Sequence, residues 1–309
     1  MRDLFFKLFS DTPFGVSEGW HIQSFNIWHF VYIILIFGGI IGAAFYLKNK
    51  PATTSEKVLR TLAFLLVFSY LTDYFVHDFV YAGFNEATGE YTRGDLNMDK
   101  LPFHICTVLC PIIAFTQFNK RFQRFIRPVA VLAVVGPMMY LCYPSTGVGG
   151  EAWCYRVVQT MFFHGVEMAW GALAIATGKT TLKWKTVWQP AVLLVCITLW
   201  AKLGATMLEY NWFFLRENPF GIEALNKPWL LPIITPLAIY ILAIAIYGIN
   251  SGVQAVAKKL QSAKPAPVFE GVAEFAPADA DGANDSVVDA VADNAADGTA
   301  DTANEQANE

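Results

Sequence analysis

Charged residues are scarce in this chain. They make up 16% of its 309 residues, whereas hydrophobic residues make up 55%. A soluble domain of ordinary composition is about one quarter charged. The composition excludes a disordered chain, a small disulfide scaffold and a collagen-like fibre, and it indicates a polytopic membrane protein.

Cysteine is sparse as well, and the five cysteines do not have the pattern of a disulfide framework. Cys106, Cys110, Cys142 and Cys196 lie in or next to apolar runs, and Cys154 lies in a loop. A bridge between Cys142 and Cys154 across a short outer loop is one alternative. Free thiols that pack as small hydrophobic side chains are the favoured interpretation.

The sequence motifs of soluble enzymes are absent. There is no G-x-x-x-x-G-K-[ST] phosphate-binding loop, and G-x-G-x-x-G, H-E-x-x-H and G-x-S-x-G are missing too. No basic patch interleaved with aromatic residues lies outside the apolar runs, which argues against a nucleic-acid partner. Membrane lipid is the partner that the composition predicts.

Negative charge is concentrated at the C-terminus. Residues 265–309 contain eleven acidic residues and no basic one, which leaves 22 basic against 15 acidic residues in the preceding body. A basic body suits a bilayer with an anionic cytoplasmic leaflet, and a polar acidic tail is typical of a disordered segment. We therefore expect an extracytoplasmic or interfacial segment 1–24, a membrane domain 25–250, a basic juxtamembrane segment 251–264 and a disordered tail 265–309.

The apolar runs predict an all-α fold, a bundle of seven transmembrane helices. A spanning helix needs about 20 mostly apolar residues. Lys and Arg are concentrated in the loops after the first, third and fifth runs and after the last run. The positive-inside rule then predicts a multi-pass plasma-membrane protein with its N-terminus outside and its C-terminus in the cytoplasm. The predicted spans are residues 25–47, 61–82, 101–118, 125–143, 157–177, 187–210 and 229–249.

Ionisable side chains within these runs share one depth. The predicted orientation places them in the outer half of the bilayer and leaves the inner half almost purely apolar. Such residues are costly in lipid and are functional candidates, although ion pairs that only hold helices together are the alternative for any one of them. His29 is expected at the headgroup level beside Trp28. The predicted polar pocket is lined by Asp73, His77, Thr107, Lys202, Glu209 and Asn211, and the candidate catalytic residues are His104, Cys106, His164 and Glu167.

Three segments resemble the YwaF-like integral membrane proteins. LPFHICTVLCPIIAF (residues 101–115) is similar to their L-P-x-H-[LI]-C signature, and YNWFFLRENP (residues 210–219), followed by KPW (residues 227–229), is similar to a second conserved stretch. RVVQTMFFHG (residues 156–165) resembles the span that carries their second histidine. Trp212 replaces a Tyr of the second stretch, and Glu217-Asn218 stands where a Lys is expected.

The resemblance implies lipid chemistry. Animal relatives of this family are cysteine-dependent acyltransferases that move a polyunsaturated acyl chain onto a lyso ether phospholipid. Their nucleophilic Cys directly precedes the histidine that aligns with His104, a position that is Phe103 here. Cys106, less than one helical turn further along, is then the candidate nucleophile. His104 or His164 is the candidate base, and Glu167 or Asp73 the group that orients it.

Two other functions fit the same residues. A zinc ion held by His77, His104, His164 and Asp73 could activate water for hydrolysis, although the predicted last span lacks the histidines of seven-span lipid amidases. No other cofactor is expected. Alternatively, Lys202 and the intramembrane carboxylates form a solute or proton site of a transporter or binding protein. A structural protein whose tail binds a partner is a third interpretation.

Overall fold

The computed structural model describes residue 9, residues 12–76, 84–85, 90–91, residue 98, and residues 101–143, 149–219 and 222–262. All of them belong to one compact unit, Met1–Ala263. The predicted disordered tail and His77 lie outside the described residues, as do residues 1–11 apart from Phe9.

The described part of the chain is helical except for a hairpin of two-residue strands, β1 (Phe84–Asn85) and β2 (Glu90–Tyr91), which pair antiparallel. Its seven α-helices match the predicted spans in order. Their bounds are α2 Ile27–Leu47, α3 Ala52–Val76, α4 Ile105–Phe118, α5 Ile126–Cys142, α6 Tyr155–Ala176, α7 Trp188–Met207 and α8 Leu231–Ser262. Short 3-10 helices are η1 Glu18–Trp20, η4 Lys120–Phe125, η5 Trp184–Thr186, η6 Trp212–Phe214 and η7 Glu223–Leu225.

Five of the described helical stretches are long and apolar enough to cross a membrane. α4 has only 14 residues, and α6, although it has 22, is not among the five stretches. Length and composition therefore give five candidate spans within a helical membrane protein. These spans are Ile27–Leu47, Ala52–Val76, Lys120–Cys142, Trp184–Met207 and Leu231–Lys259.

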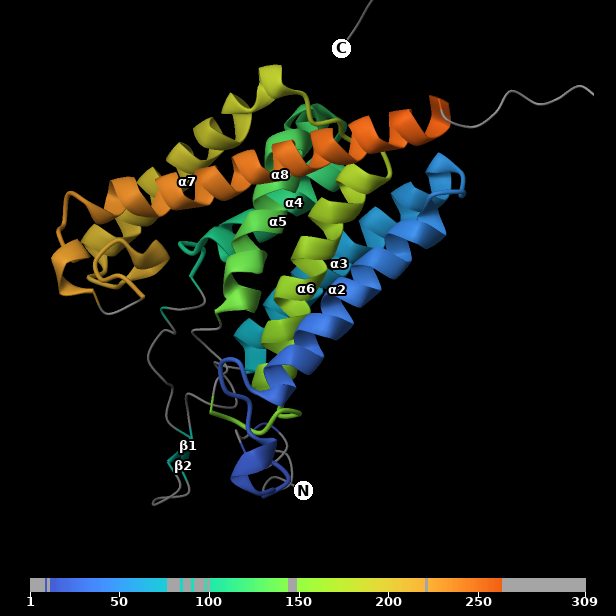
Figure 1. Cartoon of the computed structure of the whole chain (residues 1–309). Coiled ribbons are helices and arrows are strands. Elements are labelled where there is room, and N and C mark those ends of the chain that lie inside the picture. Colours follow the sequence, from blue (N-terminus) through green and yellow to red (C-terminus); the bar gives the residue numbers. More distant parts are fainter. Residues whose placement is uncertain are drawn as a thin grey trace, which may run out of the picture. The chain divides into compact units, whose positions relative to one another are not determined.

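α5 forms the centre of the bundle. Its residues Val129, Ala130, Val131, Leu132, Ala133 and Val135 have no exposed surface, whereas only 11% of the α2 span and 17% of the α8 span are buried, as in helices that face lipid. In Figure 1, α2, α3 and α6 lie side by side, and α8 crosses α5 and α7.

α5 and α6 approach each other unusually closely at Gly171. A Cβ added to this glycine would lie 2.5 Å from the carbonyl oxygen of Ala130 and 3.1 Å from the Cβ of Ala133. Only a residue without a side chain fits this contact between two backbones. Gly171 therefore fixes the separation of the two central helices.

The segment before α2 is held against the loop before α6. Ile22 donates its N–H to the carbonyl of Gly150 (2.9 Å) and accepts from the N–H of Gly149 (2.8 Å). The side chain of Asn26 then accepts from the N–H of His29 and caps α2. The chain thus enters α2 from a hydrogen-bonded turn.

The carboxylate of Glu151 is the anchor of this contact. Its two oxygens accept from the N–H groups of Phe14 (2.8 Å) and Val16 (2.9 Å), and the side chain is almost fully buried. Burial by itself raises the pKa of this carboxyl group. The N–H groups of Phe14, Val16 and Gly15, with the nearby His21, outweigh that effect and lower the pKa.

His29 is buried within the protein. Its Nδ1 accepts from the N–H of Phe25 (2.9 Å), so Nε2 carries the proton and donates to the carbonyl of Leu141 (2.6 Å). The imidazole thereby joins the start of α2 to the end of α5. Its role in this structure is a packing contact between helices.

Candidate functional site

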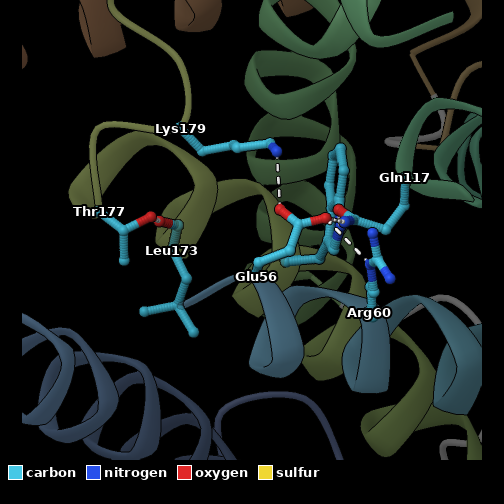
Figure 2. A network of polar contacts seen from close by, with 7 residues as sticks. Glu56, Arg60, Gln117, Leu173, Thr177 and Lys179 are labelled. Atoms are coloured by element: carbon cyan, nitrogen blue, oxygen red, sulfur yellow. Dashed lines mark hydrogen bonds and ion pairs between the residues drawn. The ribbon is translucent and has the colours of Figure 1, made fainter. Parts of the chain in front are cut away.

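A polar cluster joins α3, α4 and α6 at the end of the bundle next to the basic loops. The Glu56 carboxylate accepts from Lys179 Nζ (2.7 Å), Arg60 Nε (3.0 Å) and Gln117 Nε2 (2.9 Å). Gln117 Oε1 accepts from the indole N–H of Trp170 (3.0 Å). We call Glu56, Arg60, Gln117, Trp170 and Lys179 the inner clasp. Figure 2 shows Glu56, Arg60, Gln117 and Lys179 as labelled sticks.

The inner clasp includes two neutral polar side chains from the predicted spans, Gln117 and Trp170. Gln117 and Trp170 are buried, and sequence reasoning missed both because it followed ionisable groups. An amide and an indole are neutral, yet each needs a partner when it is buried. A glutamine within an apolar run is the sequence signal that indicates Gln117, and a buried glutamine requires a partner such as the Trp170 indole.

Residues 101–104, directly before α4, form no helix, although Leu101, Pro102 and Phe103 are apolar. Two indole groups bind carbonyls at the entry of α4: Trp200 Nε1 donates to Pro102 O (2.7 Å), and Trp212 Nε1 donates to Met98 O (2.8 Å). The ring of Phe103 lies against both indoles, with centroids 5.2 Å from Trp200 and 4.5 Å from Trp212. Gly204 makes room, because a Cβ there would lie 2.5 Å from the Phe103 ring. Phe103 is therefore a packing residue. It stands at the position where the resemblance to the acyltransferase relatives places their nucleophilic Cys.

His104 occupies the N-cap position of α4, but its side chain does not cap the helix. Its Nδ1 faces the N–H of Phe213 at 3.4 Å, and its ring lies edge-on to Phe214 at 6.5 Å. Phe213 and Phe214 have φ of 57° and 54°, and Glu209 in the same loop has φ of 53°. Left-handed backbone is strained for such residues and is concentrated at functional sites. His104 therefore packs against a strained loop.

The clearest meeting of predicted catalytic residues lies between α4 and α6. The thiol of Cys106, in the first turn of α4, interacts with the carboxyl group of Glu167 in the middle of α6. α5 contributes Gly136, where a Cβ would lie 3.6 Å from Cys106 Sγ. Glu167 has no exposed surface, and Cys106 is 7% exposed. Cys110, one turn further along α4, also lies near Glu167.

His164 lies three residues before Glu167 on α6. Its Nδ1 is 2.8 Å from the carbonyl oxygen of Thr160, and its ring stacks on Tyr140 with centroids 3.8 Å apart. Tyr140 in turn follows Gly136 by four residues on α5. His164 is therefore about one helical turn from the Cys106–Glu167 contact along the α5–α6 interface.

The other predicted polar residues are distributed over separate places. Asp73 is buried near the hydroxyl groups of Tyr70 and Tyr155. The hydroxyl of Thr107 donates to the carbonyls of Leu101 and His104. No group of three potential metal ligands occurs among the described residues, and His77, which the zinc alternative requires, lies outside them.

A pocket of about 440 Å³ opens at the end of α7. Lys202 and Glu209, both predicted to line a pocket, contribute to its wall with Arg216 and Glu217. Asn211 instead shapes the adjoining loop, because its Oδ1 accepts from the N–H groups of Arg216 (2.9 Å) and Glu217 (3.1 Å). In the described residues the pocket wall includes neither Cys106 nor Glu167.

All five cysteines are free thiols, so the bridge between Cys142 and Cys154 is not formed. Cys106, Cys110 and Cys154 are buried, as the interpretation of free thiols packed as small hydrophobic side chains expects. Cys142 and Cys196 are exposed. Thiol reagents should therefore modify the two exposed cysteines faster than the three buried ones.

Comparison with known proteins gives one family. Residues 24–249 match the TMEM164 family, a family of membrane proteins. No curated protein and no solved structure matches the chain. The matched residues include α2 to α7 and most of α8, together with the Cys106–Glu167 contact. The chain therefore belongs to the TMEM164 family.

Proposed function

We propose that this protein is a lipid-modifying membrane enzyme that transfers acyl chains between phospholipids, with Cys106 as the nucleophile. The observation that carries the proposal is the position of the thiol, in the first turn of α4 and against the carboxyl group of Glu167. The positive end of a helix stabilises a thiolate, which is the nucleophilic form. The resemblance to the YwaF-like proteins and their acyltransferase relatives supports the same chemistry.

The reaction has two steps. Cys106 Sγ attacks the carbonyl carbon of a donor ester, and the thiol proton passes to an imidazole, for which the described residues offer His104 and His164. The C–O bond then breaks, the leaving alkoxide takes the proton, and the acyl chain remains as a thioester. In the second step, the hydroxyl of a lysophospholipid attacks the thioester, and the thiol is regenerated. The balance needs neither metal nor cofactor, and membrane lipid is both substrate and partner.

We further propose that all seven α-helices cross the plasma membrane, with the N-terminus outside. α4 is short but continues outward as the segment whose carbonyls Trp200 and Trp212 bind, and non-helical backbone at membrane depth requires such partners. α6 has many polar residues but turns Glu167 into the protein. Labelling of single added cysteines at residues 50 and 122 from the cytoplasmic side, and at residue 153 from outside, tests the orientation.

The test of the acyl transfer uses the full chain in lipid discs with a lysophospholipid and a phospholipid that carries a labelled acyl chain. Mass spectrometry follows the label. We expect transfer by the wild type, none by Cys106→Ala, and transfer near the wild-type rate by Cys110→Ala, which removes a buried thiol one turn away on the same helix. Full transfer by Cys106→Ala would contradict the thiol mechanism.

The pocket beside α7 favours a second function, the binding of a small solute without catalysis. Lys202, Glu209, Arg216 and Glu217 line it, and among the described residues none of the four forms an ion pair. Unpaired charges on a pocket wall are available to a solute. A wild type that transfers no acyl chain but takes up a labelled zwitterionic solute into vesicles, with uptake lost in Lys202→Met, supports this function over the first.

A further inference from the structure

The first turn of α4 presents backbone N–H groups that lack acceptors. The first intrahelical bond runs from Val108 N to His104 O (2.9 Å), and His104 does not cap the helix with its side chain. Within the described residues, no oxygen accepts from the N–H groups of Ile105, Cys106 and Thr107. The helix therefore begins with three donors and a partial positive charge.

This helix end lies inside the protein. Fourteen residues of α4 are about 21 Å long, whereas the hydrocarbon core of a bilayer is about 30 Å thick. Ile105 and Cys106 are both buried. Buried N–H groups without an acceptor cost free energy unless a bound ligand accepts hydrogen bonds from them.

Glu167 is the second observation at the same place. It has no exposed surface, and no nitrogen or oxygen donor of the described residues reaches either of its carboxyl oxygens. Its polar neighbours are the thiols of Cys106 and Cys110 on α4. On α5, Gly136 lies at Cys106, and His164 on α6 turns its Nδ1 to the carbonyl of Thr160.

We propose that Glu167 is a neutral carboxylic acid at pH 7 and that, with the N–H groups of the first turn of α4, it forms the oxyanion site for the acyl group that Cys106 attacks. This inference rests on the proposed function. Without a cation or several donors beside it, a buried carboxylate is far more costly than the neutral acid. A neutral acid is also a donor, as an oxyanion site requires.

The chemistry assigns each group one task. When Cys106 Sγ bonds to the carbonyl carbon, the electrons of the C=O π bond move to the oxygen. The Glu167 O–H and the N–H groups donate to that negative oxygen, and they are held in place before the reaction begins. When the C=O bond re-forms, the alkoxide leaves with the proton taken from Cys106. Glu167 keeps its proton throughout and is therefore not the base.

Two substitutions of one residue test this role. Glu167→Gln keeps a neutral donor of the same length, and we expect its kcat for acyl transfer to stay within about tenfold of the wild type. Glu167→Leu keeps the size and removes the donor, and we expect a loss of about 10²–10³-fold in kcat, the usual effect of removing one oxyanion donor. If Glu167 were a base or an anionic orienting group, Gln would lose as much activity as Leu.

An infrared difference spectrum between the wild type and Glu167→Gln at pH 7 gives a readout independent of turnover. We expect the C=O stretching band of one protonated carboxylic acid in the wild type only. Absence of that band overturns the proposal even in an active enzyme. A wild type that transfers no acyl chain overturns the proposed function and the oxyanion role together. An active wild type whose Gln and Leu variants fail equally overturns the oxyanion role alone.

Discussion

Replacement of Gly171 by alanine tests whether the close α5–α6 contact determines the stability of the protein. The new Cβ would lie 2.5 Å from the carbonyl oxygen of Ala130, whereas ordinary van der Waals contact begins at 3.4 Å. The obstacle is backbone, so the helices must move apart by most of that difference. Overpacking of this kind costs about 1–3 kcal/mol, and alanine regains up to about 1 kcal/mol through its higher helix propensity.

We therefore expect Gly171→Ala to lose about 1–2 kcal/mol of stability. Gly38→Ala on α2 is the matched control, because a Cβ there meets nothing within 4 Å. It should be neutral or slightly stabilising. The assay heats the protein in detergent and measures its monodisperse peak by size-exclusion chromatography. The midpoint is the temperature at which half of that peak is lost. A Gly171→Ala variant as stable as Gly38→Ala would refute the close approach of the two helices.

Three further predictions concern groups outside the catalytic pair. Lys179→Met removes one partner of Glu56 in the inner clasp, and because both side chains are partly exposed we expect a loss of about 1 kcal/mol in the same heating assay; an unchanged midpoint contradicts the clasp. His29→Phe keeps the ring but loses the bond to Leu141 O, so about 1–3 kcal/mol should be lost, and full stability would show that the bond is not formed. The lowered pKa of Glu151 adds stability that is complete above the ordinary carboxyl pKa and is lost as the pH falls through the lowered value. The stability difference between wild type and Glu151→Gln should therefore be largest at pH 7 and shrink as the pH falls below the ordinary carboxyl pKa. A difference that does not change with pH would contradict the anchor.

The helices could be predicted because apolar runs determine them, and the deviations have local causes. α3 begins at Ala52, nine residues before the predicted start, directly after Pro51, a residue that favours the first turn of a helix. α8 continues 13 residues beyond the predicted end at 249, because residues 250–262 are less apolar yet contain good helix formers. A helix need not end where its apolar run ends.

The candidate site could be predicted only in part. Spacing along one helix places Cys106 and Cys110 on one face, but it does not show that Glu167 of another helix meets them. The non-helical chain before α4 could not be inferred either. Leu101, Pro102 and Phe103 are apolar, and the indoles of Trp200 and Trp212 that bind carbonyls of this segment lie far along the chain.

Those two indoles also determine when α4 can complete its structure during synthesis. Trp200 and Trp212 follow Pro102 and Met98 by 98 and 114 residues. When the ribosome has just made α4, the carbonyls before it have no partner, and a 14-residue helix inserts poorly by itself. The entry of α4 must therefore remain hydrated or shielded until α7 and the loop after it have been made. In a truncated chain that ends before α7, water-soluble thiol reagents should therefore modify Cys106.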